Sequence, residues 1–149
     1  FEVERQALAQ MQHPAIAQIF DAGTTPEGHA FIAMEHVEGK PLAEFCTTHA
    51  LGRDQRLALF VRVCQGVQHA HQKGVVHRDQ KPDNVLVRWI DGMPSPKIID
   101  FGIAWSTGAS TLTHVGTAVG SPGFLAPEQV RGAAVTPATD VFSLGAIPA

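Results

Sequence analysis

The sequence has only two cysteines, Cys46 and Cys64, which are too few for a disulfide framework. Both fall in apolar helical patterns, where buried and reduced thiols are expected, and this favours a cytoplasmic location. No apolar run is long enough to cross a bilayer, and no charged-then-apolar leader opens the chain. The net charge is only −3, which gives no basis for binding nucleic acid or an anionic membrane. We therefore expect neither nucleic acid as a partner nor a membrane segment within this chain.

The composition that remains is typical of a globular protein. Hydrophobic residues make up 44% of the chain and charged residues 17%, which argues against disorder. With 149 residues, the chain has room for one domain at most. It begins at Phe1 within a helical pattern, and Pro148 interrupts a second helical pattern at the other end. We expect a fragment of a domain.

Hydrophobic periodicity and turn residues predict a mixture of helices and strands. Helices are expected over residues 1–12, after Pro41 to about Thr48, and over 53–72, and another helical pattern begins near the end of the chain. Strands are expected over 15–21, 29–37, 85–87 and 97–99, with the first two forming an antiparallel hairpin. A long loop is expected from 101 to about 127.

The helix over 53–72 is the clearest of these predictions. It is expected to bury one apolar stripe, made of Leu57, Phe60, Val61, Cys64 and Val67. Gly74 is expected to cap its end. His69 and His71 would point about 200° apart on this helix, so they are not expected to share a metal.

The segment that carries the chemistry is His77-Arg78-Asp79-Gln80-Lys81-Pro82-Asp83-Asn84. Phosphoryl transfer needs a carboxylate for the substrate hydroxyl, a cation for the moving phosphoryl group and an oxygen ligand for Mg²⁺. Asp79, Lys81 and Asn84 are the right chemical types in that order. Five fixed residues at this spacing arise by chance on the order of 10⁻⁵ to 10⁻⁴ times in a chain of this length.

The segment resembles the catalytic loop of the protein kinase family, which reads H-R-D-L-x-x-x-N. Asp100-Phe101-Gly102 resembles the family's D-F-G motif, in which the Asp binds Mg²⁺. Ala126-Pro127-Glu128 resembles its A-P-E motif. Ser121 matches the hydroxyl residue that hydrogen-bonds the catalytic Asp and Lys in Ser/Thr kinases. The family more often has Thr there.

The resemblance extends to residues that would hold ATP. Glu4 would pair with the ATP-positioning lysine, and Met34 would be the gatekeeper. The backbone of Glu35 and Val37 would meet adenine, and Leu86 would form the floor of the adenine pocket.

The resemblance implies a partial, two-lobe α+β fold of the protein kinase type, with residues 1–37 ending the N-lobe and 38–149 forming the hinge and part of the C-lobe. It implies a bacterial-type Ser/Thr kinase that uses ATP and Mg²⁺ to phosphorylate Ser/Thr hydroxyls of proteins. The resemblance leaves open whether the chain belongs to the cytoplasmic domain of a membrane-anchored kinase. Asp140 would brace the backbone of the catalytic loop.

Arg78, beside the catalytic carboxylate, is expected to pair with a phosphate on the activation segment. The candidate acceptors are Thr111, Thr113 and Thr117, with Thr113 and Thr117 preferred.

The sequence departs from the family in three respects. It has no glycine-rich loop, and Lys40, Lys73 and Lys97 all lie in the wrong context for the ATP-positioning lysine. Gln80 replaces an inward-packing Leu, at a cost of about 1–3 kcal/mol if its amide is unsatisfied. We expect no appreciable kinase activity from the 149 residues alone. A non-catalytic pseudokinase scaffold and a small-molecule phosphotransferase are the alternative interpretations.

Overall fold

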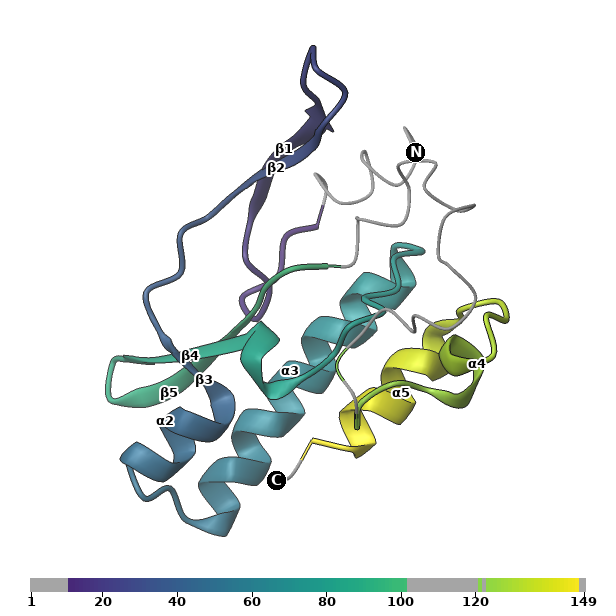
Figure 1. Cartoon of the computed structure of the whole chain (residues 1–149). Helices are drawn as coiled ribbons and strands as arrows, with labels where there is room; N and C mark the ends of the chain where they lie inside the picture. Colours follow the sequence, from purple (N-terminus) through teal and green to yellow (C-terminus); the bar gives the residue numbers. More distant parts are fainter. Residues whose placement is uncertain (1–10, 102–120, 122, 148–149) are drawn as a thin grey trace.

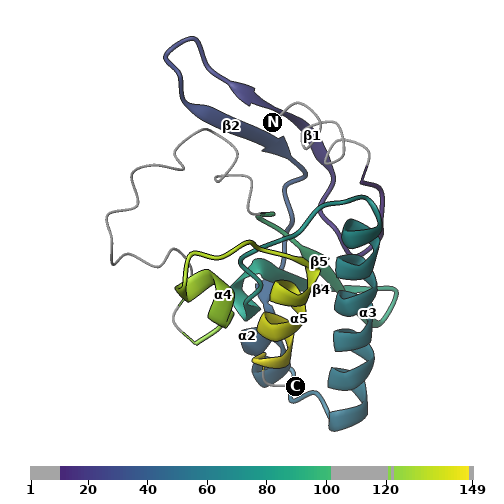
Figure 2. The same cartoon turned by 90° about the vertical axis from the view of Figure 1, so that its right-hand side faces the viewer.

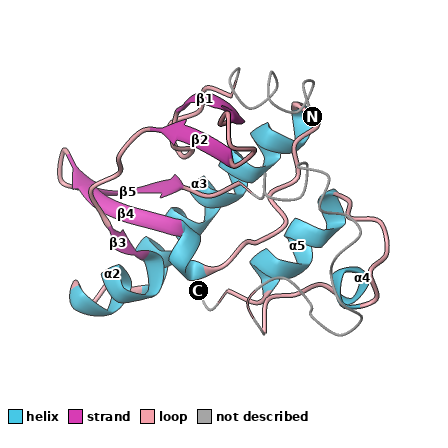
Figure 3. Cartoon of the chain, turned by 45° about the horizontal axis from the view of Figure 1, so that its top comes forward, coloured by secondary structure: helices cyan, strands magenta, loops and turns pink. Residues whose placement is uncertain are grey.

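The computed structural model describes residues 11–101, 121 and 123–147 (Figure 1). Within these residues the fold is α+β, with two small antiparallel sheets, and α2 and α3 contact the larger of them. Figure 3 shows the two sheets lying apart from each other. The helix predicted over 1–12 lies almost entirely outside the described residues.

The smaller sheet is a hairpin of β1 (Ile19–Thr24) and β2 (Ala30–Met34), which project away from the rest of the molecule (Figure 1). The predicted antiparallel hairpin is therefore confirmed, but its first strand runs over 19–24 and not over the predicted 15–21. Residues 15–17 pair with another strand instead: the Ala17 N–H donates to the Ile98 carbonyl at 2.9 Å, and the Ile98 N–H donates to the Ala15 carbonyl at 2.8 Å. The apolar pattern of 15–17 therefore reflects burial against this second partner.

The larger sheet has the strand order β3-β4-β5, formed by β3 (Lys40–Pro41), β4 (Val85–Ile90) and β5 (Met93–Ile98). A two-residue turn joins β4 to β5, and both Asp91 and Gly92 have positive φ angles of 50° and 74°. This is the primed geometry that matches the twist of paired strands. The turn was predicted, but the two strands are longer than the predicted 85–87 and 97–99.

Two prolines, Pro94 and Pro96, hid the true length of β5 because proline ordinarily interrupts a strand. They lie four and two residues before Ile98, so their nitrogens face the same side of the strand as the Ile98 N–H. That N–H points away from β4 and donates to the Ala15 carbonyl. The prolines therefore occupy positions whose nitrogen faces the outer edge, and they remove no hydrogen bond from the β4–β5 ladder.

Five helical elements complete the described part of the fold: α2 (Leu42–Thr48), α3 (Arg53–Gln72), the 3₁₀ turn η1 (Pro82–Asn84), α4 (Pro127–Val130) and α5 (Pro137–Gly145). The bounds predicted for α3 are confirmed, and Gly74 just beyond its end has a φ of +77°. Figure 2 shows α5 running beside α3, with α4 next to it. In the part of the chain that the structure describes, no helix combines the length and hydrophobicity needed to span a membrane.

The predicted stripe of α3 is confirmed only in part, because Val67 is buried and Phe60 and Cys64 are partly buried against the core. The residues that α3 buries are Leu59, Val63, Gly66, Val67 and Ala70. Leu57 and Val61 are 42% and 52% exposed. A Cβ at Gly66 would lie 2.9 Å from Ile98 Cδ1, so α3 approaches β5 closely at this glycine. Because α3 has two apolar faces, periodicity alone could not indicate which one the sheet would cover.

Candidate active site

The predicted catalytic loop connects the end of α3 to β4, and Asp140 of α5 holds its backbone. The Asp140 carboxylate is 1% exposed and accepts hydrogen bonds from the N–H groups of His77 and Arg78, both at 2.8 Å. Arg78 has a φ of +73°, a left-handed conformation that costs a non-glycine residue free energy. The prediction that Asp140 braces this backbone is confirmed.

A third group, His71, also contacts this carboxylate. His71 Nε2 lies 2.7 Å from Asp140 Oδ2, and the two residues are separated by 69 positions in the sequence. Asp140 therefore joins the last turn of α3, the loop and α5 at one buried point. From the sequence, His71 was assessed only as a possible metal ligand. The residues around it give no indication of a partner 69 positions further along the chain.

His77 is fully buried and links the loop to the residues around Asp100. Its Nε2 lies 2.9 Å from the Ile99 carbonyl, and its Nδ1 accepts the N–H of Asp79 at 3.3 Å. The neutral tautomer with the proton on Nε2 satisfies both contacts. Burial lowers the pKa of His77, which favours this neutral form. The imidazole packs against the ring of Phe101, with centroids 4.6 Å apart.

Four of the predicted site residues lie together, and we call Asp79, Lys81, Asn84 and Ser121 the catalytic cluster. Asn84 Nδ2 donates to the Asp79 carbonyl at 2.8 Å and to Asp79 Oδ2 at 3.1 Å. Lys81 Nζ lies 3.3 Å from Asp79 Oδ2 and donates to Ser121 Oγ at 2.8 Å. The predicted contact between Ser121 and the lysine is confirmed, and its contact with Asp79 stays a prediction.

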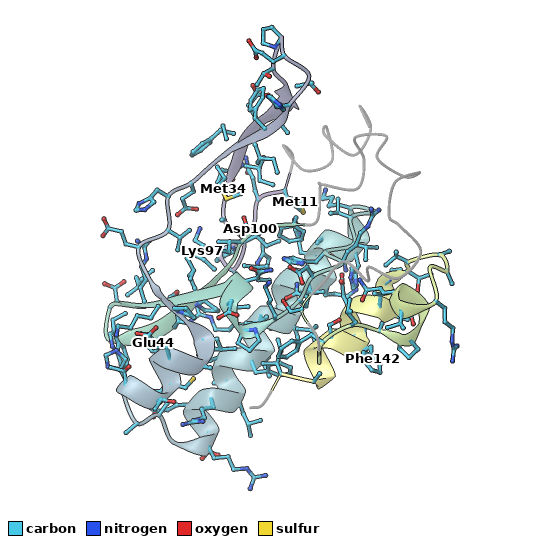
Figure 4. The ribbon with its side chains drawn as sticks, viewed as in Figure 1. Met11, Met34, Glu44, Lys97, Asp100 and Phe142 are labelled. Carbon is cyan, nitrogen blue, oxygen red and sulfur yellow. The ribbon has the colours of Figure 1, made fainter. Side chains whose placement is uncertain are left out.

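Asn84 and Asp100 are the predicted magnesium ligands. The Ile99 N–H donates to the Asn84 carbonyl at 2.9 Å, which ties η1 to the segment leading into Asp100. Asp100 is exposed, has a φ of +55°, and lies near Met34 and Lys97 at the base of the hairpin (Figure 4). Because Asn84 directs its N–H groups at Asp79, its amide oxygen is left as an acceptor. An amide oxygen and a carboxylate are donors that Mg²⁺ prefers.

The residues predicted to line the adenine site lie at the end of β2, just after it, or on β4. Met34 and Leu86 are half-buried, and Val37 is buried. The N–H of Glu35 donates to the Gln18 carbonyl at 2.8 Å, and its carboxylate lies 2.8 Å from Lys97 Nζ. The pairing of Glu35 with Lys97 was not predicted.

The predictions for Glu4, Thr111, Thr113 and Thr117 concern residues outside the described part of the chain.

The segment after Ser121 is anchored to the catalytic loop through Gln129. Its Nε2 donates to the Arg78 carbonyl at 2.7 Å, and its Oε1 accepts the N–H of Ala126 at 3.0 Å. Ser143 of α5 donates to the Phe124 carbonyl at 2.6 Å. Neither Gln129 nor Ser143 was predicted from the sequence. Both side chains hydrogen-bond to backbone groups of distant residues, and neither belongs to a recognisable motif.

Gln80 is the residue where the sequence departs from the expected loop pattern. Its side chain is fully buried, and neither its Nε2 nor its Oε1 has a hydrogen-bond partner among the described residues. The Gln80 amide is therefore unsatisfied among the described residues, which is the condition under which it was predicted to cost about 1–3 kcal/mol of stability.

Comparison with known proteins agrees with this geometry. The family model described as "protein kinase domain" matches residues 1–149. The serine/threonine-protein kinase PrkC of Bacillus subtilis is 38% identical over 148 residues, covering 99% of this chain and 22% of that protein. Pkn1 of Myxococcus xanthus, also a serine/threonine-protein kinase, is 39% identical over 149 residues, covering 99% of this chain and 21% of that protein.

A solved structure supports the same assignment. The crystal structure of the Mycobacterium tuberculosis PknI kinase domain superposes with a TM-score of 0.72 at 28% identity. The match covers 97% of this chain and 52% of that one. The chain therefore spans about half of a solved kinase domain and about a fifth of the curated relatives that it matches.

Proposed function

This chain belongs to the protein kinase family, and we propose that it supplies the catalytic loop of a Ser/Thr protein kinase. The reaction is transfer of the γ-phosphoryl group of ATP to Ser or Thr hydroxyls of a protein substrate. The observation that carries this proposal is the catalytic cluster, a chain of contacts that runs from the Asn84 amide to the Asp79 carboxylate, on to the Lys81 ammonium group and then to the Ser121 hydroxyl.

Asp79 is proposed to orient the substrate hydroxyl and accept its proton. Its Oδ2 is held between Asn84 Nδ2 at 3.1 Å and Lys81 Nζ at 3.3 Å. A carboxylate fixed in this way is pre-positioned for general-base work, which contributes about 10²–10⁴-fold to rate. Lys81 is proposed to offset charge on the moving phosphoryl group, because its ammonium group lies beside the carboxylate that receives the hydroxyl.

Asn84 and Asp100 are proposed to hold Mg²⁺ through the amide oxygen and the carboxylate. Mg²⁺ supplies neutralisation of phosphate charge when it is bound. The adenine ring is proposed to meet the backbone of Glu35 and Val37 between Met34 and Leu86.

Ser121 is proposed to favour Ser/Thr over Tyr acceptors. Its hydroxyl accepts a hydrogen bond from Lys81, so the substrate-docking turn and the catalytic loop are joined at the point where an acceptor hydroxyl would enter.

A cytoplasmic location is also proposed. Cys46 and Cys64 are free, and burial raises the pKa of both thiols. Protonated, buried thiols are unreactive, and free cysteines are typical of a reducing compartment.

A chimera tests the catalytic proposal. Residues 1–149 would replace the aligned segment of B. subtilis PrkC, and transfer of labelled phosphate from ATP to a generic protein substrate would be measured. Asp79→Asn is expected to lower the rate by about 10²–10⁴-fold. Asp54→Asn, the same change at an exposed aspartate on α3, should leave the rate unchanged.

Equal activity of the Asp79→Asn and Asp54→Asn chimeras would contradict the proposed role of Asp79. A chimera that folds and binds ATP but transfers no phosphate would favour the non-catalytic scaffold.

A further inference from the structure

An ion pair at the base of the projecting hairpin has no role in the chemistry described above. Lys97 of β5 and Glu35, the residue after β2, lie with Nζ and Oε2 2.8 Å apart. Their side chains are only 18% and 26% exposed, so solvent screens this pair less than a surface pair. The two residues are 62 positions apart in the sequence.

Both charged groups also bind a third segment, residues 16–18. Lys97 Nζ donates to the Ile16 carbonyl at 3.3 Å. The Glu35 carboxylate accepts the N–H of Gln18 at 3.1 Å, and the Glu35 N–H donates to the Gln18 carbonyl at 2.8 Å. One ion pair therefore joins the chain before β1, the chain after β2, and β5.

The backbone pairing next to the ion pair fixes the same joint. Ile98, adjacent to Lys97, exchanges hydrogen bonds with Ala15 and Ala17. Beyond this point the β1–β2 hairpin projects away from the larger sheet (Figure 1). The orientation of the hairpin and of the chain leaving it therefore depends on contacts at its base.

Lys97 is also close in sequence to a predicted magnesium ligand, because Asp100 follows three residues later (Figure 4). A movement of Glu35 relative to Lys97 would change the distance between the chain after β2 and Asp100. The hydrogen bond from Lys97 is the main reason that the pKa of Glu35 lies below its ordinary value, which favours the charged carboxylate.

We infer that Lys97 and Glu35 form a positioning clamp, which fixes the adenine-contacting backbone at residues 35–37 relative to Asp100. Only the expected effect of the clamp on ATP binding rests on the proposed function. The structural part of the clamp, the tether between the hairpin and β5, follows from the contacts alone.

The structural part is tested on the 149-residue chain by amide hydrogen exchange. Lys97→Met and Glu35→Gln are each expected to speed exchange of the Glu35 and Ile98 amides by about tenfold or more, because the joint opens locally. The double variant should exchange no faster than the faster single variant, because both changes break one interaction.

A second ion pair provides a matched control. Lys40 Nζ and Glu44 Oε1 are also 2.8 Å apart, but their side chains are 47% and 55% exposed and the two residues are only four positions apart in the sequence. Lys40→Met and Glu44→Gln should leave exchange at Glu35 and Ile98 unchanged. Equal exchange in the two sets of variants would overturn the clamp.

The effect on nucleotide is tested in the PrkC chimera through the KM for ATP and kcat. Loss of the clamp is expected to raise the KM for ATP about three- to tenfold with a smaller change in kcat, since it disturbs adenine placement more than phosphoryl transfer. An active chimera whose KM for ATP is unchanged by Lys97→Met would overturn the inference. An inactive chimera with the unaltered segment would instead count against the proposed function, and the exchange experiment would still decide the tether.

Discussion

Replacing Asp140 perturbs the buried point at which α3, the catalytic loop and α5 meet. The carboxylate accepts the N–H groups of His77 and Arg78 at 2.8 Å and lies 2.7 Å from His71 Nε2. Asp140→Ala removes all three contacts at once. Because the carboxylate is 1% exposed, the space left at the acceptor is too enclosed for bulk water to serve the same donors freely.

The expected loss follows from the donors left behind. A buried donor without a partner costs about 1–3 kcal/mol, and two backbone N–H groups are affected. The left-handed conformation of Arg78 stores about 1–3 kcal/mol more, and the loop releases this when the carboxylate no longer holds it. The two donors together cost about 2–6 kcal/mol, and relaxation of Arg78 offsets part of this, so we expect Asp140→Ala to lower the free energy of unfolding by about 1–4 kcal/mol.

Asp140→Asn separates the hydrogen bonds from the packing. The amide is nearly the same size and keeps one oxygen acceptor, but its NH₂ group faces a donor. We expect a loss of about 1–3 kcal/mol for this variant. If Asp140→Ala does not fold, Asp140→Asn still provides a measurable value.

The assay is equilibrium unfolding of the chain in urea, with amide exchange at His77 and Arg78 as a local measurement. Glu38→Ala and Glu38→Gln are the matched controls, because Glu38 is an exposed acidic residue in a loop. Their free energies of unfolding should stay within about 0.5 kcal/mol of the unaltered chain. If the Asp140 variants fall in the same range, the buried carboxylate does not hold the loop and the reasoning is refuted.

Three further variants test the burial described above. Gln80→Leu should raise the free energy of unfolding by about 1–3 kcal/mol, because it removes a buried amide that has no partner among the described residues. Gln72→Leu, at an exposed position, should change the free energy of unfolding little. A loss of stability in Gln80→Leu would contradict this prediction. Gly39→Ala should lower the free energy of unfolding by about 1–3 kcal/mol, because the new Cβ would lie 3.0 Å from a backbone oxygen of β4. Gly145→Ala adds a Cβ in open space and is the control. Urea unfolding of both variants measures the difference. Burial lowers the pKa of His77, so its contribution to stability is full above the ordinary pKa of about 6.5 and falls as the pH drops from there towards the folded-state pKa. That fall is at most about 1.4 kcal/mol per pH unit, and His77→Phe should remove it, whereas identical pH profiles of the two chains would contradict the prediction.

Much of the candidate site could be predicted from the sequence because the site is local. Asp79, Lys81 and Asn84 lie within six consecutive residues, and η1 folds them back on one another. The turn at Asp91 and Gly92 was equally predictable, because these residue types tolerate positive φ angles. Each of these features depends on neighbours a few residues away.

Other features required the tertiary structure. Which face of α3 is buried depends on the close approach of Ile98 to Gly66, and the pairing of 15–17 depends on the outer edge of β5 being available. Neither choice is encoded in the periodicity of the segment itself, because an apolar run fits a helix face, a strand or an edge contact equally well.

The sequence by itself determined which chemistry the loop from His77 to Asn84 can offer, through residue types held at short spacing. The tertiary structure decided what holds that chemistry in place. Asp140 meets His71 across 69 residues, and Lys97 meets Glu35 across 62. Such partners are selected by the packing of whole elements, since a charged side chain that becomes buried must find a counterpart wherever the fold brings one.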